Sequence, residues 1–112
     1  MSAFDRCSGL TSVIIGENVT NIGYYAFYRC YGLTNMTIPN NVTNIAEEAF
    51  YKCNNITDVY CYPNPTNLTW GPATDDFDEN KPPQCHVKAE YLTAYQTKFG
   101  STVNVTFIGD LT

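Results

Sequence analysis

The segment Ala26-Phe27-Tyr28-Arg29-Cys30 decides the fold, because close copies of it stand 23 residues to either side. Ala3-Phe4-Asp5-Arg6-Cys7 precedes it, and Ala49-Phe50-Tyr51-Lys52-Cys53 follows it. Each copy is followed, three places after its cysteine, by one apolar residue: Leu10, Leu33 and Ile56. A fixed period of this length indicates a repeat architecture, in which one supersecondary unit is copied along the chain.

The residues after each of these apolar positions predict a short strand. Apolar and polar side chains alternate there, and alternation places them on opposite faces of an extended segment. The strands are predicted at Val13–Ile15, Met36–Ile38 and Val59–Cys61. Pro39 and Pro63 end two of them, since proline cannot donate to a sheet ladder.

The other half of the unit is the segment ENVTNIG at Glu17–Gly23, which returns as NNVTNIA at Asn40–Ala46. Its Val and Ile residues, continued by Leu68 in the third copy, are spaced to pack inward from a turn or a short helix. One unit cannot bury these residues alone, but stacked units supply one another with a wall and a parallel strand. The sequence therefore predicts an α/β solenoid of about three coils.

Residues Ile38 to Val59 fit the pattern I-P-x-x-V-T-x-I-x-x-x-A-F-x-x-C-x-x-L-T-x-[VM] nearly residue for residue, and the chain follows it from residue 3 to about 70. This pattern is similar to that of the BspA-like (Treponema pallidum-type) leucine-rich repeat family. Gly16 and Cys61-Tyr62-Pro63 depart from it. The resemblance implies a leucine-rich-repeat solenoid, a right-handed superhelix with short parallel strands. It also implies a bacterial or protist surface protein that adheres to host proteins or to other cells.

Beyond the repeats, five prolines between residues 63 and 83 and the acidic stretch DDFDEN indicate an irregular loop, in which Phe77 is a candidate inward-facing residue. Alternation and helical spacing then predict a strand at Gln84–Lys88, a helix at Ala89–Phe99 and a strand at Val103–Ile108. The segment resembles the C-terminal cap of the family. We therefore expect repeats over residues 1–71 and a C-terminal β-α-β cap over residues 72–112.

Composition disfavours several classes of partner. The formal charge of −5 and the pI near 4.5 argue against a nucleic acid, because phosphate binding needs a cationic face. No apolar run approaches the roughly 18 residues needed to cross a bilayer, so membrane insertion is not expected. Met1 is not followed by a basic and then apolar signal peptide, and the chain reads as a fragment that starts within a longer protein.

An extracellular or cell-surface location is expected, because the chain is rich in Asn and Thr and poor in Lys. N-x-S/T sequons, which accept glycans in eukaryotic secretory proteins, begin at Asn18, Asn35, Asn41, Asn55, Asn67 and Asn104. A repeat rich in Thr and Asn also generates such sequons by chance.

Three of the five cysteines, Cys7, Cys30 and Cys53, fall at one repeated position and should stack as a column. Packing as small buried hydrophobes is favoured over a metal site or disulfides, because packing defines a repeated position and no C-x-x-C pair occurs. Cys61 and Cys85 lie on successive strands and could approach each other, although Val87 aligns more closely with Cys61. No cofactor or metal is predicted.

The titratable residues form no catalytic motif. His86, the single histidine, is predicted to be a surface residue, since no Ser-His-Asp or Cys-His motif accompanies it. A solvated acidic loop is favoured over a calcium site, because EF-hand spacing is missing; its residues are Asp75, Asp76, Asp78 and Glu79. One cation per coil, at Arg6, Arg29 and Lys52, suits either an acidic partner or solubility.

The outward face of the strands is the most promising binding surface, because repeat proteins commonly use their sheet face for recognition, and aromatic groups near it could anchor an interface. With so few coils, a face that contacts only water is an equal alternative. The candidate binding residues are Ser12, Ile14, Asn35, Thr37, Asp58, Tyr60, Tyr62 and Trp70.

These observations favour a non-enzymatic protein–protein interaction or adhesion domain of a cell-surface or secreted protein. One alternative is a structural cap or spacer of a longer solenoid. The other is an enzyme, which would need His86 beside an acidic residue and a serine or cysteine in a pocket. An uncapped first coil would expose Phe4, Leu10 and Val13 with an unpaired strand edge, so we also expect self-association through that end.

Overall fold

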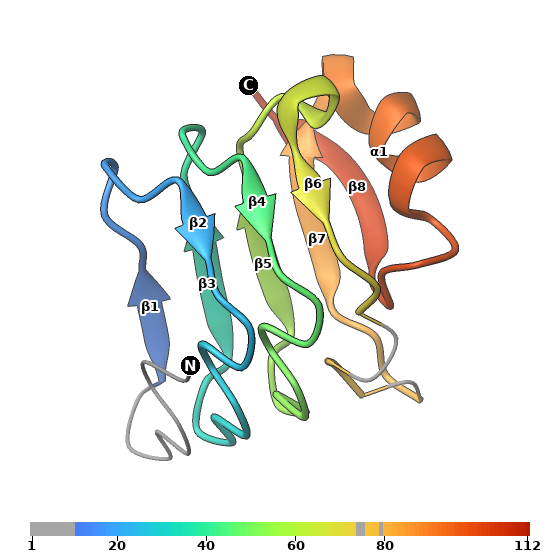
Figure 1. Cartoon of the computed structure of the whole chain (residues 1–112). Helices are drawn as coiled ribbons and strands as arrows, with labels where there is room; N and C mark the ends of the chain where they lie inside the picture. The colour runs from blue at the N-terminus through green and yellow to red at the C-terminus, as the bar shows by residue number, and fades with distance from the viewer. Residues whose placement is uncertain (1–10, 74–75, 79) are drawn as a thin grey trace.

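The computed structural model describes residues 11–73, 76–78 and 80–112, apart from the side chain of Ile14. Two parallel β-sheets face each other in this structure (Figure 1). The larger sheet has the strand order β1-β3-β5-β7-β8, and the smaller one has the order β2-β4-β6. Successive strands of the repeats alternate between the two sheets, so that each coil contributes one strand to each.

The larger sheet contains β1 (Ser12–Ile14), β3 (Asn35–Ile38), β5 (Asp58–Cys61), β7 (Gln84–Lys88) and β8 (Thr106–Leu111). The smaller sheet contains β2 (Asn21–Ile22), β4 (Asn44–Ile45) and β6 (Thr69–Trp70). The helices are the 3-10 turns η1 (Pro65–Asn67) and η2 (Ala89–Tyr91) and the α-helix α1 (Leu92–Phe99).

The strands predicted for the larger sheet are confirmed, with small changes at their ends. β7 has the expected bounds, and the predicted helix forms with its first turn as η2. The last strand begins later than expected, because Val103 makes only an isolated bridge to Ala73. The smaller sheet was not predicted: where a turn or short helix was expected, backbone amides pair between coils, as from Thr43 to Thr20 O (2.8 Å).

The register of the strands follows the 23-residue period in the first coils. Asn35 pairs with Ser12 on one side and with Asp58 on the other. The third coil is longer, because Ile45 pairs with Trp70 and not with Leu68, which the strict period would require. The 3-10 turn η1 takes up the additional length.

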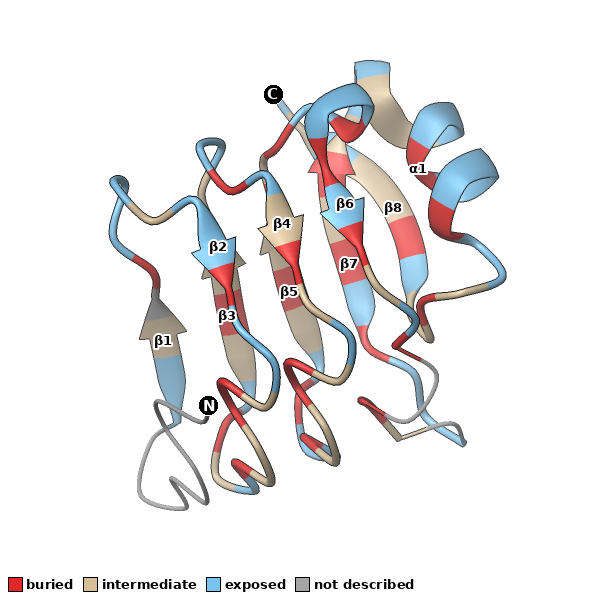
Figure 2. Ribbon diagram, in the orientation of Figure 1, coloured by how far each residue is buried: buried red, intermediate tan, exposed pale blue. Residues whose placement is uncertain are grey.

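The core lies between the two sheets, where Figure 2 shows the buried segments facing one another. Inward side chains from β3, β5 and β7 fill it, as the alternation predicts. A column of stacked rings crosses the turns, with 5.5 Å between the centroids of Phe27 and Phe50 and 5.8 Å between those of Phe50 and Phe77. Phe77 is buried, so its predicted inward role is confirmed.

Side-chain amides and hydroxyls also connect neighbouring coils. Asn41 Nδ2 donates to Glu17 O at 2.7 Å, and Asn55 Nδ2 donates to Tyr31 O at 2.6 Å. Thr34 Oγ1 donates to Thr11 O at 3.0 Å, one period back in the chain. The recurrence of Asn and Thr, which also creates sequons, therefore has a structural cause in these contacts.

Asp76 ends one of the backbone ladders of the repeats. In the preceding turn, Phe27 N donates to Ala49 O of the next coil at 2.8 Å. At the equivalent position Phe50 N donates to the Asp76 carboxylate (Oδ2, 3.1 Å), so a side chain takes the place of a carbonyl. Asp76 is completely buried, which corrects the expectation of a solvated acidic loop at this residue. Asp75 and Glu79 of that loop lie outside the described residues.

The C-terminal helix α1 packs through Tyr95 and Phe99, which are buried. The ring centroid of Phe99 lies 6.0 Å from that of Trp70, and the Tyr95 hydroxyl donates a hydrogen bond to Pro63 O at 2.6 Å. In Figure 1, α1 continues the layer formed by the smaller sheet beyond β6. Phe4 and Leu10, on which the expected self-association depends, lie outside the described residues, and Val13 is half-buried.

Candidate functional site

The outer face of the larger sheet carries most of the candidate binding residues. Ser12 is exposed, whereas Asn35, Thr37, Asp58 and Tyr60 are half-buried. Strand register aligns them in two rows, Ser12–Asn35–Asp58 and Ile14–Thr37–Tyr60. Gln84 and His86 extend these rows into β7, so the sheet brings together residues that are far apart in sequence.

Trp70 does not belong to this face. It lies on β6 in the other sheet and is only 4% exposed. The longer third coil places it opposite Ile45, an inward position, and its ring meets Phe50 and Phe99 in the core. The expectation of an exposed aromatic group at Trp70 is therefore wrong, because a strict 23-residue period assigned the inward position to Leu68.

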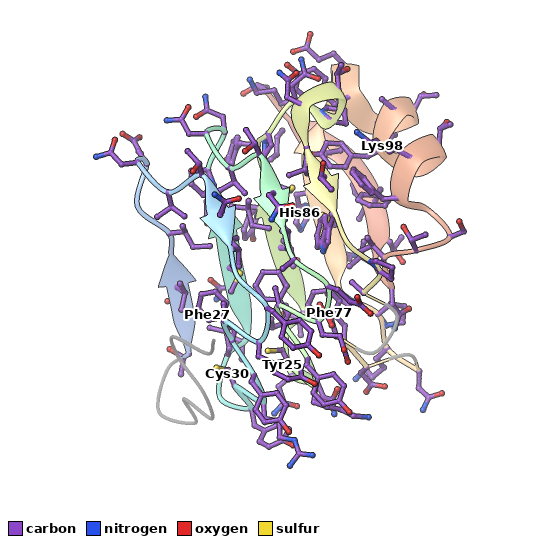
Figure 3. All side chains as sticks on the ribbon, in the orientation of Figure 1. Tyr25, Phe27, Cys30, Phe77, His86 and Lys98 are labelled. Atoms are coloured by element: carbon purple, nitrogen blue, oxygen red, sulfur yellow. The ribbon has the colours of Figure 1, made fainter. Side chains whose placement is uncertain are left out.

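His86 is held more tightly than a surface histidine. Its Nε2 lies 2.8 Å from Asp58 Oδ1 on β5, and its Nδ1 lies 2.8 Å from Asp110 Oδ2 on β8. Its ring also stacks on Tyr60, with 4.7 Å between centroids and 13° between planes. Its side chain is only 12% exposed, which corrects the interpretation as an ordinary surface residue. His86 belongs to β7 and is labelled in Figure 3.

A bulge in β8 explains how Asp110 reaches His86. His86 pairs with Ile108 and Lys88 pairs with Leu111, so β8 has one extra residue in this interval. Asp110 lies within the bulge, and bulges redirect side chains in this way. The contact could not be predicted from alternation alone, which assumes a regular register.

The hydrogen bonds favour the protonated form of His86. Both ring nitrogens face carboxylates, and both can donate only in the imidazolium form. Burial lowers the pKa of His86, but the hydrogen bonds to Asp58 and Asp110 raise it more, so this pKa lies above its ordinary value of 6.5. The same hydrogen bond holds the pKa of Asp58 below its ordinary 3.8.

The hydrogen bonds of this cluster are not those of a hydrolytic triad. Thr57 Oγ1 donates to Asp58 Oδ2 at 2.9 Å, so the nearby hydroxyl contacts the acid and not the base. Both nitrogens of His86 are already engaged with carboxylates. Over the described ranges, no group of three or more His, Cys, Asp or Glu side chains is arranged to hold a metal ion.

A shallow groove of about 310 Å³ lies at the end of this face where the repeat strands stop. Thr37 and Tyr62 line it together with Lys88 and Glu17, so it combines an aromatic ring with one charge of each sign. Two of the predicted binding residues, Thr37 and Tyr62, therefore share one concave surface. Tyr62 follows β5 and is half-buried.

The described cysteines lie in the core. Cys30 and Cys53 are buried at the same position of successive coils, as the packing interpretation predicts, while Cys7 lies outside the described residues. Burial raises the pKa of the Cys53 thiol well above its ordinary range, and its Sγ contacts Phe27 O at 2.8 Å. Cys61 and Cys85 are buried free thiols.

Several tyrosines in the turns between the sheets have contacts that were not predicted. Tyr28 and Tyr51 occupy the same position of successive coils, and their rings stack at 5.4 Å. Arg29 and Lys52 lie beside them, at the positions of the expected cation column, and Arg6 is outside the described residues. The repeated Tyr-Arg and Tyr-Lys pairs were the available signal in the sequence.

The parallel strands and the contacts between repeats are consistent with an α/β repeat fold. The family model described as "BspA type Leucine rich repeat region (6 copies)" matches residues 1–71, and the chain belongs to this family. Comparisons with curated proteins and with solved structures give no significant match. Among the described helices, none has the length and apolar character to span a membrane.

Membership of this family indicates the general class of function. Leucine-rich repeats commonly mediate protein interactions, and the family is generally non-enzymatic. BspA-type repeats are typically found in surface or secreted proteins.

Proposed function

We propose that this chain is a protein-interaction domain of a cell-surface or secreted adhesion protein, and that it binds its protein ligand on the outer face of the larger sheet. One observation carries this proposal: Thr37, Tyr60 and His86 form a continuous, partly exposed row across three strands. Rows of this kind on a rigid sheet suit recognition, because the scaffold holds the contacting side chains in place before binding.

The His86 cluster supports this choice of face. Hydrogen bonds and ring stacking restrict the side chains of Asp58, Tyr60 and His86 in the free protein. A partner that contacts them therefore loses little conformational entropy in these side chains on binding. The groove beside Tyr62 adds a concave region next to the flat row.

We further propose that residues 1–71 form a right-handed solenoid and that residues 72–112 are its C-terminal cap. Parallel strands linked by crossovers support the handedness, since such connections are right-handed in nearly all proteins. The cap is supported by the Asp76 carboxylate, which accepts the Phe50 amide hydrogen, and by α1, which covers Trp70 through Phe99. A cap of this kind excludes water from the last coil.

A pair of matched threonine variants tests the binding face. Thr37 lies on the outer face of the larger sheet, and Thr69 is exposed on β6 of the other sheet. Binding of the wild type, Thr37→Arg and Thr69→Arg to immobilised, purified collagen and laminin is measured by surface plasmon resonance. We expect the wild type and Thr69→Arg to bind one of these proteins alike, and Thr37→Arg to lose that binding.

The outcomes separate the proposal from its main alternative. If the folded wild type binds neither matrix protein, the structural cap or spacer without binding of its own is favoured for these ligands. Equal binding by Thr37→Arg and the wild type would place the binding site elsewhere on the surface. Circular dichroism of each variant shows whether it is folded.

A further inference from the structure

Four tyrosines in the turns of two neighbouring coils form one continuous group of rings, which we call the tyrosine platform: Tyr24, Tyr25, Tyr28 and Tyr51. The ring centroids of Tyr24 and Tyr25 are 4.1 Å apart, and Tyr28 and Tyr51 lie with only 5° between their planes. Tyr24 is 44% exposed. Figure 3 shows Tyr25 among these turns, separated from His86.

Two cations, Arg29 and Lys52, accompany the platform. Arg29 Cζ lies 5.1 Å from the centroid of the Tyr28 ring, and Lys52 Nζ lies 5.6 Å from that of Tyr51. The ion pairs found in the described part of the chain all involve His86, so neither cation is neutralised by a neighbour there. In a chain with a net charge of −5, these two cations form no ion pair with another described residue.

Two acids, Glu47 and Glu48, belong to the same turns. Glu48 accepts a hydrogen bond from the Tyr24 hydroxyl at 3.3 Å, at the opposite end of the platform from the two cations. The positive charge is therefore concentrated beside Tyr28 and Tyr51. An anionic group would be attracted to this end.

The backbone beneath the platform is held in place by the neighbouring coil. Arg29 N donates to Tyr51 O at 2.8 Å, and both Arg29 and Lys52 have left-handed φ angles, 54° and 62°. Left-handed non-glycine residues cost about 1 kcal/mol or more each, so they persist only where the surroundings fix them. The same conformation occurs earlier in each turn, at Tyr25 and Glu48. Successive coils thus repeat one fixed presentation of ring and cation.

We propose that the tyrosine platform, with Arg29 and Lys52, is a second binding site that takes an acidic carbohydrate chain, such as a polymer of uronic acid. A sugar ring presents a flat C–H face, which packs on an aromatic ring, and hydroxyls, which can bond with phenols. The carboxylate of a uronic acid pairs with Arg or Lys. The site combines these three kinds of group on one surface.

A peptide fits the platform less well than a carbohydrate. Peptides typically dock by adding a strand to an open sheet edge or by placing side chains in a pocket. The backbone amides of Phe27 and Arg29 already donate to the next coil, so they cannot pair with an added strand. The platform residues line neither the groove beside Tyr62 nor another hollow, which is lined by Ile56 and Lys81. The rings and the two cations of the platform are partly exposed, so a ligand can reach them.

The test uses hyaluronan oligosaccharides, which carry one carboxylate per disaccharide, titrated into the folded protein at physiological salt and followed by NMR. Lys52→Gln is compared with Lys81→Gln, a matched loss of one lysine charge at an exposed residue away from the platform. The double variant Arg29→Gln/Lys52→Gln removes both cations. Neutral dextran and poly-glutamate serve as probes for sugar binding without charge and for charge without sugar.

We expect hyaluronan to bind the wild type and Lys81→Gln equally, and the double variant about tenfold or more weakly. Dextran and poly-glutamate should bind much more weakly than hyaluronan. The proposal fails if hyaluronan does not bind, if the double variant binds normally, or if Lys81→Gln loses as much affinity as Lys52→Gln. Poly-glutamate that binds as tightly as hyaluronan would overturn it in favour of an acidic protein partner. Thr37→Arg should leave hyaluronan binding unchanged, which keeps this test independent of the proposed protein-binding face.

Discussion

The imidazole of His86 and the carboxylate of Asp58 lie on neighbouring strands, with Nε2 2.8 Å from Oδ1. Asp110 contacts the other ring nitrogen, so the two acids together favour the imidazolium form of the ring. Because this charged group lies on the proposed binding face, its protonation affects both the stability of the fold and the charge of the surface.

The first prediction concerns the pH dependence of stability. The pKa of folded His86 is raised above 6.5, so its contribution to stability is complete below pH 6.5 and is lost as pH rises through the folded pKa. The lowered pKa of Asp58 makes its contribution complete above pH 3.8 and lost as pH falls through its folded pKa. We therefore expect the wild type to have a larger free energy of unfolding than His86→Gln, and this difference should be greatest between pH 3.8 and pH 6.5. The difference should become smaller at alkaline pH.

Urea unfolding of both proteins at a series of pH values measures this difference. Tyr62→Phe, which leaves the cluster intact, is the control and should follow the wild type. A constant difference between wild type and His86→Gln from pH 5 to pH 9 would show that the ion pairs do not respond to pH as their geometry requires.

The second prediction concerns the end of the backbone ladder. Asp76→Ala removes the acceptor of the Phe50 amide hydrogen inside the core, and an unsatisfied buried donor costs about 1–3 kcal/mol of unfolding free energy. Asp78→Ala removes a partly exposed acid of the same loop, whose Oδ1 accepts from Asn80 N, and should cost less. Chemical denaturation compares the two variants, and equal stabilities would contradict the role given to Asp76.

The third prediction compares two glycines. A Cβ at Gly71 would lie 2.7 Å from Glu47 N and 2.9 Å from Glu47 Cα, so Gly71→Ala forces two coils apart and should destabilise the fold by about 1–3 kcal/mol. A Cβ at Gly16 would meet nothing within 4 Å, so Gly16→Ala should change stability by less than about 1 kcal/mol. Thermal unfolding measures the stability of both variants, and the expectation is wrong if the two variants have the same melting temperature.

The fourth prediction concerns the asparagine contacts between coils. Asn41→Ala removes the 2.7 Å hydrogen bond to Glu17 O and should cost about 1 kcal/mol. The adjacent exposed residue serves as its control, since Asn40→Ala leaves this hydrogen bond in place and should be nearly neutral. Denaturation curves in which both substitutions have the same effect would remove the structural explanation for the repeated asparagines.

Much of the larger sheet could be predicted from the sequence, because its strands depend on local alternation and on a constant period. Met36, Val59 and Cys85 all point inward, as alternation requires. The smaller sheet was missed because two-residue strands such as Asn44–Ile45 are too short to show alternation. They form through hydrogen bonds between coils, which a local pattern does not contain.

The candidate site was only partly predictable for a related reason. Thr37 and Tyr60 follow from alternation, but Trp70 was misplaced, because the third coil departs from the period. The position of Asp110 beside His86 depends on a bulge, and the tyrosine platform depends on contacts between coils. Such features depend on how distant segments are aligned with one another. That alignment is known only when the register between the strands is known.

The constant register between the first coils has a consequence for how such a gene can change. Because Asn35 meets Ser12 in the same way that Asp58 meets Asn35, the two faces of a coil are complementary to each other. An in-frame duplication or deletion of a unit with the 23-residue period would leave every remaining interface with a matching partner, whereas the longer third coil does not keep this period. Recombination between the repeats can therefore lengthen or shorten the array while the Asp76 terminus stays as it is, and each added unit with the same turn would add one more ring and one more cation to the platform.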